Sequence, residues 1–203
     1  MADFKIATTV GARIAALRKA RGFTSAKALA DSIPSDSVTE SLLQNIEAGR
    51  QNDLAVAQLL NIAWALRVSP VFLLAPLGSP HEHLDLPGII PDLENLTVAE
   101  FDAWISGIDG AYRPITTDEH SERAQLEALR ELLRERREAR RLRTVIELSA
   151  ELTPHEPEHD EPAKWADFQE RLDDANRRIQ QLETYLGSGG WNINHPPESD
   201  LHP

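Results

Sequence analysis

Apolar residues recur at helical spacing through the first part of the chain, and turn-forming residues interrupt them. Val10, Ile14 and Leu17 predict one face of a first helix, and Gly22 stands where a C-terminal cap belongs. Further helix starts are predicted at Thr24 or Ser25, at Thr39, at Asn52 or Asp53, and at Pro70. The helix after Asn52 or Asp53 has an apolar sector formed by Val56, Leu59, Leu60, Ala63, Trp64 and Leu66. Five short helices within residues 1–78 can enclose one small core.

The rest of the chain predicts longer helices. Thr97 and Glu100 form a capping-box pair that opens a helix, and a charged helix is expected over 118–152. A Pro-rich acidic loop separates it from a last helix over 163–186. The apolar residues of that helix are Trp165, Phe168, Leu172, Ala175, Ile179, Leu182 and Leu186. Their spacing alternates between three and four, which is the heptad pattern of a coiled coil. The expected fold class is all-α.

Proline and glycine content predicts the boundaries between these parts. Residues 79–96 are rich in both and are expected to form a linker. This linker separates a domain at 1–78 from a helical oligomerisation region at 97–186. Residues 187–203 are expected to be a flexible tail.

Composition narrows the class of protein. The chain has 203 residues and no cysteine, so disulfides, zinc ribbons, iron–sulfur clusters and thiol catalysis are not expected. Its longest apolar stretch, 54–77, is interrupted by Asn61, Arg67 and Pro70, which argues against a membrane partner. The first residues carry no apolar signal core. A cytoplasmic location is expected, within the nucleoid if DNA is the ligand.

Charge is distributed unevenly along the chain, whose formal net charge is −12. Residues 1–78 hold eight basic and six acidic side chains, a balance of +2. Residues 79–203 hold thirteen basic and twenty-seven acidic side chains, a balance of −14. Because phosphates repel acidic surfaces, a nucleic acid is expected to contact only the first segment.

From Gly11 to Leu74 the chain resembles the Cro/C1-type (XRE-family) helix-turn-helix regulators. The matching residues are Arg13-Ile14, Leu17-Arg18, Gly22-Phe23-Thr24, Leu29-Ala30, Leu43, Ile46 to Arg50, Leu59 to Ser69 and Phe72 to Leu74. The resemblance implies a five-helix, lambda-repressor-like DNA-binding domain. Two features depart from the family: Thr24-Ser25-Ala26 lacks the usual Gln at the start of the second helix, and the turn at 32–38 is longer.

The resemblance places the helix at about residues 40–48 in the major groove of a duplex. Leu43 and Ile46 are expected to face the core. The remaining positions are the expected base contacts: Glu40, Ser41, Leu42, Gln44 and Asn45. Among them, a carboxylate can accept from cytosine N4, an amide can pair with adenine, and a leucine can cover a thymine methyl group.

Hydroxyls, amides and cations near helix ends suit the phosphate backbone. The expected phosphate contacts are Ser25, Lys27, Thr39, Arg50 and Gln51, with Arg13, Lys19 and Arg21 as weaker candidates. By the resemblance, Arg18 and Glu47 form a structural ion pair inside the domain. A surface pair of little energetic value is the alternative.

The heptad seam of the last helix is the expected dimerisation surface, since regulators of this kind bind two-fold operators. The seam residues assigned to dimerisation are Trp165, Phe168, Leu172, Ile179, Leu182 and Leu186. The alternative is an antiparallel hairpin in which the helix at 118–152 packs on the same seam. The two arrangements can also coexist as a four-helix assembly.

Two other clusters carry less specific signals. The arginines of the 134–143 stretch are expected to be solvated and paired with Glu131, Glu135 and Glu138, and a second DNA-contacting surface is the alternative. His81, His83, His155 and His159 have spacings that a metal ion can use, but they lie in Pro- and acid-rich loops. No metal, cofactor or catalytic residue is expected, and the protein is not expected to be an enzyme.

The sequence therefore predicts a sequence-specific DNA-binding transcriptional regulator, expected to be a repressor, that binds double-stranded operator DNA as a homodimer. The alternative is a coiled-coil interaction protein or antitoxin whose helix-turn-helix module is degenerate.

Overall fold

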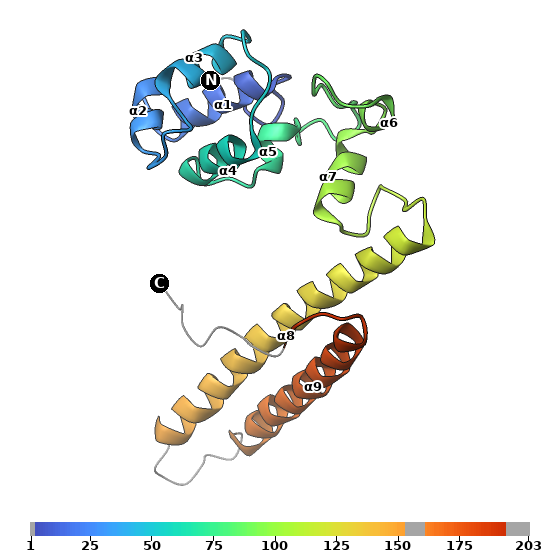
Figure 1. Cartoon of the computed structure of the whole chain (residues 1–203). Coiled ribbons are helices and arrows are strands. Elements are labelled where there is room, and N and C mark those ends of the chain that lie inside the picture. The colour runs from blue at the N-terminus through green and yellow to red at the C-terminus, as the bar shows by residue number, and fades with distance from the viewer. Residues whose placement is uncertain (1–2, 153–160, 194–203) are drawn as a thin grey trace. The chain divides into compact units, whose positions relative to one another are not determined.

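The structure is a computed structural model that describes residues 3–152 and 161–193 (Figure 1). Within these ranges it consists of nine helices and no strand, which confirms the predicted all-α class. The chain divides into two units: unit 1 ends at Arg113, and unit 2 begins at Pro114.

Unit 1 contains seven short helices among its described residues. They are α1 (Val10–Ala20), α2 (Ala26–Asp31), α3 (Glu40–Glu47), α4 (Val56–Ala65), α5 (Val71–Leu74), α6 (Pro91–Glu94) and α7 (Val98–Ser106). The hydroxyls of Thr9, Ser25 and Thr39 cap α1, α2 and α3 by accepting from backbone N–H groups at 3.1, 3.1 and 3.2 Å. These caps satisfy amides that have no partner inside the helix.

The first five helices of unit 1 share one apolar core. Its fully buried side chains come from all five: Ile14, Leu17, Leu29, Leu43, Ile62, Leu66 and Leu73. From α4, only the side that carries Ile62, Ala63 and Leu66 reaches this core. Val56, Leu60 and Trp64, which belong to the same predicted apolar sector, are exposed to solvent instead.

The predicted linker at 79–96 is not a spacer but a folded part of unit 1. Leu84 is buried, and it packs with Val98 and Phe101 in a second apolar cluster. Leu84 N–H donates to Leu96 O at 3.2 Å, and Val98 N–H donates to Glu82 O at 2.8 Å. The prolines and glycines of this segment therefore form turns that bring its leucines onto α7. The boundary between the units lies after Arg113 rather than at this segment.

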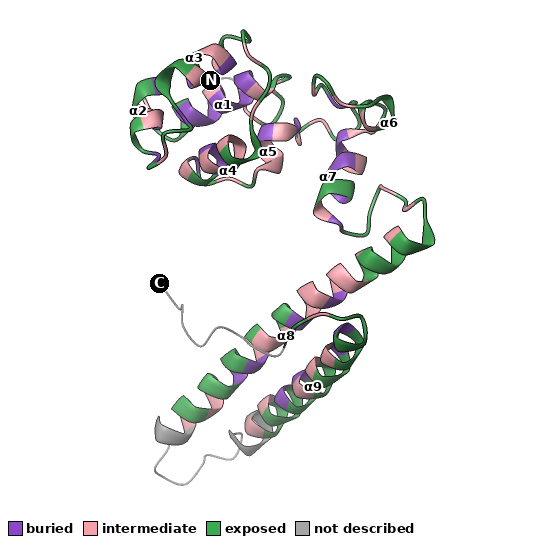
Figure 2. Ribbon diagram, in the orientation of Figure 1, coloured by how far each residue is buried: buried purple, intermediate pink, exposed green. Residues whose placement is uncertain are grey.

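Unit 2 is an antiparallel pair formed by α8 (Thr117–Leu152) and α9 (Glu161–Ser188) (Figure 1). Their facing sides are buried and their outer sides exposed (Figure 2). Two apolar clusters fill the contact: Ala128 and Leu132 with Leu182 and Leu186, and Ala139 and Leu142 with Leu172 and Ala175. Ion pairs flank it, among them Glu131 with Arg178 at 2.7 Å and Arg136 with Glu183 at 2.7 Å.

Residues 187–193, the first part of the predicted tail, are folded as part of unit 2. Gly187 and Ser188 belong to α9, and the residues after them turn back onto unit 2. Trp191 donates its indole N–H to Gln125 at 2.7 Å, and Ile193 packs in the cluster around Leu132. Trp191 and Ile193, which follow the glycines, pack this segment against the two helices. The glycine-rich composition did not indicate this contact. Residues 194–203 lie outside the described part of the chain.

None of the helices in the described ranges combines the length and apolarity that a bilayer crossing requires.

Candidate nucleic-acid interface

Helix α3 presents a polar side to solvent and an apolar side to the core of unit 1. Leu43 and Ile46 are buried, whereas Glu40, Ser41 and Gln44 are exposed. These three lie where base contacts were predicted. They include a carboxylate, a hydroxyl and an amide, which together can donate to and accept from base edges.

Two of the predicted base-contact residues are less available. Leu42 is half-buried and packs against the core, so only part of its side chain can cover a base methyl group. Asn45 is also half-buried, and its carbonyl oxygen accepts from the backbone N–H groups of Arg50 and Gln51 at 2.8 and 3.2 Å. The backbone of Asn45 thereby closes the C-terminal end of α3.

Gln44 and Glu40 interact on the exposed side of α3. The side-chain amide of Gln44 donates to a carboxylate oxygen of Glu40 at 2.9 Å, across one turn of the helix. This bond uses one N–H of the Gln44 amide, which leaves its carbonyl oxygen and its second N–H available for other hydrogen bonds. Glu40 thus restrains the orientation of this amide.

Arg18 fixes the far end of α3 to α1. Its Nε and Nη2 atoms donate to the two carboxylate oxygens of Glu47 at 2.6 and 2.7 Å, and Nη1 donates to Phe23 O at 2.9 Å. The two side chains are 8% and 14% exposed, so the pair is largely shielded from water. Hydrogen bonding of its guanidinium to the Glu47 carboxylate is the main cause that raises the pKa of Arg18. The predicted pair is present and uses the two-pronged geometry that suits arginine.

A close backbone approach by α1 also fixes this C-terminal end of α3. A methyl group built on Gly11 of α1 would lie 2.0 Å from the carbonyl oxygen of Ile46. Only glycine permits this approach. The sequence analysis did not single out Gly11 for this role, because the contact partner lies far along the chain.

The lengthened turn between α2 and α3 is anchored at both of its ends. Ile33 and Val38 are buried in the core of the first five helices. Gln58 of α4 donates to Ser37 O, close to the end of the turn, at 2.9 Å. The additional residues therefore form an ordered connection, which keeps Thr39 at the start of α3.

The residues predicted to contact phosphates differ in exposure and in the hydrogen bonds that they already make. Ser25 and Thr39 cap α2 and α3 through their oxygens, which leaves each hydroxyl hydrogen able to donate. Lys27 is exposed and pairs with Asp31 at 2.9 Å, and this bond raises its pKa. Arg50 is exposed beyond the end of α3, whereas Gln51 is half-buried and donates to Asp53 O at 3.0 Å.

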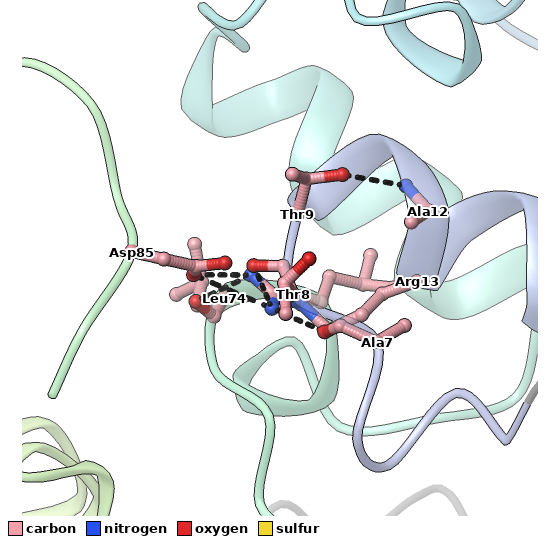
Figure 3. A network of polar contacts seen from close by, with 8 residues as sticks. Ala7, Thr8, Thr9, Ala12, Arg13, Leu74 and Asp85 are labelled. Atoms are coloured by element: carbon pink, nitrogen blue, oxygen red, sulfur yellow. Dashed lines mark hydrogen bonds and ion pairs between the residues drawn. The ribbon is translucent and has the colours of Figure 1, made fainter. Parts of the chain in front are cut away.

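Arg13 was a weaker phosphate candidate, and that expectation is wrong because its side chain is fully buried. Its guanidinium donates to four backbone carbonyls, those of Ala7, Thr8, Leu73 and Leu74, at 2.8 to 3.0 Å (Figure 3). A carboxylate oxygen of Asp85 lies 3.4 Å away (Figure 3). Burial is the main cause that lowers the pKa of Arg13, and Asp85 opposes it. The side chain ties α1 to the end of α5.

Arg21, another weaker candidate, follows the last residue of α1 and donates through Nε to Leu66 O at 2.9 Å. Its guanidinium is therefore partly engaged with the C-terminal end of α4. Lys19 is exposed.

The predicted dimerisation residues lie in the contact between α8 and α9 of the same chain. Leu172, Leu182 and Leu186 are buried there, and Phe168 and Ile179 pack at its edge. Trp165 is half-buried and stacks edge-on against Phe168 with ring centroids 6.5 Å apart. The structure thus has the antiparallel hairpin that the sequence left as the alternative.

The arginines of 134–143 take part in several pairs, but largely not with the predicted partners: Arg141 pairs with Glu138 at 3.7 Å, whereas Glu131 pairs with Arg178 of α9. Arg134 pairs with Glu127 at 2.9 Å, and Arg136 reaches across to Glu183. Arg143 donates to Asn176 at 2.9 Å. Several of these contacts cross between the helices, so they stabilise the hairpin as well as the α8 surface.

No group of three or more His, Asp or Glu side chains suited to a metal ion occurs in the described residues. His83 uses its ring to contact Asn95 O at 3.0 Å, while His155 and His159 lie outside the described ranges.

Comparisons of the chain with family models, with curated proteins and with solved structures yielded no match.

Proposed function

We propose that this protein is a sequence-specific DNA-binding transcriptional regulator, in which α2 and α3 form a helix-turn-helix within a lambda-repressor-like domain. The observation that carries the proposal is the exposed polar side of α3, held in place at both ends. Gly11 and Arg18 of α1 fix this helix against the core, and Thr39 caps its start. A rigid helix with outward carboxylate, hydroxyl and amide groups is the usual means of reading bases in the major groove.

Charge supports a restricted contact with DNA. Residues 1–113 hold nine basic and thirteen acidic side chains, a balance of −4, so the protein has no general attraction for phosphates. Ser25, Lys27, Thr39 and Arg50 lie near α3 and supply local phosphate contacts. Because each copy makes few such contacts, one copy binds weakly. A homodimer on a two-fold operator doubles the number of contacts, and we therefore propose this form. Occlusion of the polymerase at such an operator makes the protein a repressor.

Selection of binding sites from randomised duplexes tests this proposal. The full chain is expected to enrich sites with two-fold symmetry, whose half-sites lie about 34–36 Å apart. Enrichment of no sequence would contradict the proposal, because a regulator of this type needs base preference. Thr39→Ala should reduce the enrichment of every sequence alike, since it removes a helix cap and a phosphate contact without altering base-reading groups.

A second candidate is an interaction protein or antitoxin whose small helical domain does not bind DNA. The pairing of Lys27 with Asp31 favours it, because a cation close to α3 is already neutralised. This candidate predicts no affinity for any duplex even at low salt, and it predicts that α8 and α9 retain a protein partner from the native host.

A further inference from the structure

Helix α4 carries a row of large apolar side chains on its solvent side. Val56, Leu60 and Trp64 follow one another at intervals of four residues, so they lie on one ridge of the helix. They are 73%, 49% and 74% exposed. Contiguous apolar patches of this kind usually mark an interaction site. Since other residues of α4 already fill the core, this ridge is not needed for the fold of unit 1.

We infer that the ridge of Val56, Leu60 and Trp64 packs against the same ridge of a second copy of this chain. The pairing joins two copies of unit 1 about a two-fold axis. The inference rests on the proposed function for its purpose, which is to place two copies of α3 on neighbouring half-sites. The contact itself does not require DNA.

The first argument for a second copy is that the other dimerisation surface is already occupied. Leu172, Leu182 and Leu186 of the heptad seam are buried against α8 within one chain. Two copies cannot pair through this seam without opening the hairpin. The ridge on α4 is an apolar row that remains exposed.

The second argument is electrostatic. Each copy has a formal net charge of −12, so two copies repel one another over most of their surfaces. Helix α4 contains no charged residue between Val56 and Ala65. A second copy can therefore approach this face without bringing like charges together, whereas a strongly charged partner would find no complementary charge on α4.

The third argument is shape. An antiparallel pairing with Leu60 on the two-fold axis places Val56 of one copy opposite Trp64 of the other. A large side chain then meets a smaller one, as good packing requires. Arg67 lies 5.4 Å from the centroid of the Trp64 ring and covers part of the indole.

A hollow of mixed character lies beside Trp64. It has a volume of about 370 Å³, and its walls combine Phe23, Ile33, Pro34 and Ala65 with the polar residues Ser32, Ser35, Asn61 and Arg67. Three ridge residues are far fewer than the roughly 20–30 residues per partner of a standard interface. The dimer is therefore weak in free solution and is strengthened when both copies bind one duplex.

Cysteine cross-linking detects such a weak contact directly, because the natural chain contains no cysteine. Leu60→Cys places a thiol on the predicted axis. A short bismaleimide should join two such chains at least tenfold faster than it joins chains carrying Leu133→Cys. Leu133 on α8 is the matched control, since it is the same residue type and is 48% exposed. Val56→Cys should cross-link to itself poorly, because the antiparallel pairing separates the two copies of this position.

Trp64→Glu gives an independent measurement. It should abolish the cross-linking of Leu60→Cys chains and weaken self-association in analytical ultracentrifugation at least tenfold. Its circular dichroism should be unchanged, because Trp64 is outside the core. Equal cross-linking rates at positions 60 and 133 would overturn the inference, and so would a chain that stays monomeric on the selected duplex.

The experiment separates this inference from the proposed function. Fast cross-linking at position 60 together with no affinity for any duplex supports the dimer contact and contradicts the regulator. If the chain binds a duplex but Leu60→Cys chains cross-link slowly while bound to it, the dimer contact is contradicted and the regulator proposal is not.

Discussion

Arg18 and Glu47 are joined by two hydrogen bonds, at 2.6 and 2.7 Å, that link α1 to the last residue of α3. Twenty-nine positions separate these residues in the chain, so the pair closes a large part of unit 1. Shielding from water makes such a pair important for geometry, although the desolvation of both groups limits its net stabilisation. The orientation of α3 therefore depends on a pair that lies behind the candidate interface.

Removal of one member of this pair should be more harmful than removal of both. We expect Arg18→Met or Glu47→Leu alone to lower the free energy of unfolding by about 3 kcal/mol, because each leaves a charge without its partner. The double variant should recover part of that loss. Urea unfolding of the four proteins gives the coupling energy. Additive losses would mean that the pair is an ordinary surface contact.

Gly11→Ala should displace α3. The added methyl group would meet the carbonyl oxygen of Ile46 at 2.0 Å, and backbone atoms cannot move aside as a flexible side chain can. We expect a loss of about 1–3 kcal/mol in the free energy of unfolding, together with weaker duplex binding by the protein that remains folded.

Gly187→Ala is the matched control for this substitution. Gly187 lies inside α9, and no atom lies within 4 Å of the added methyl group. Alanine should stabilise the helix there by roughly 0.5 kcal/mol and leave duplex binding unchanged. Equal effects of the two substitutions would contradict the close α1–α3 contact.

Gln44 and Arg50 should affect DNA binding in different ways. Gln44→Ala removes a base-reading amide, so it should cost about 1–3 kcal/mol on the preferred duplex and little on other duplexes. Arg50→Glu should weaken binding to all duplexes by similar factors, because it acts on phosphates. Arg141→Glu in α8 is the control for the charge change. Competition assays on preferred and scrambled duplexes measure both effects, and a uniform loss from both substitutions would refute this division of roles.

The start of α7 should weaken in acid. The backbone N–H of Thr97 donates to Glu100 at 2.8 Å, and this bond, together with that from the Thr97 hydroxyl, lowers the pKa of Glu100 below its ordinary 4.5. The ionised carboxylate stabilises the folded state, so its contribution is complete above pH 4.5 and is lost as the pH falls through the lower folded-state pKa.

Glu100→Gln isolates this effect. The variant should be less stable than the natural chain at neutral pH, and the difference in unfolding free energy should vanish in acid. A difference that stays constant from neutral to acid pH would show that the carboxylate charge has no part in the cap.

Local signals allowed the sequence to predict much of the fold. The caps at Ser25 and Thr39 and the capping box of Thr97 and Glu100 depend on residues three positions apart, and all are present. Helix α8 begins at Thr117, one residue before the predicted start. The exposed positions of α3 also follow from the period of Leu43 and Ile46.

Contacts between distant residues were less predictable. Arg13 is buried in contact with two carbonyls nearby in the chain and two others 60 and 61 positions away, and no local pattern indicates the distant pair. Helix α4 is apolar on nearly all sides, so the spacing of its apolar residues does not indicate which side meets the core. The heptad seam of α9 has the same pattern whether its partner is α8 or another chain.

The salt dependence of duplex binding tests the central claim, that α3 reads DNA with support from few phosphate contacts. As salt rises from about 50 to 200 mM, the logarithm of the affinity for the selected duplex should fall linearly with the logarithm of the salt concentration. Arg50→Gln should reduce the magnitude of this slope by about 1. Absence of measurable affinity at the lowest salt, or an affinity that salt does not change, would contradict the account.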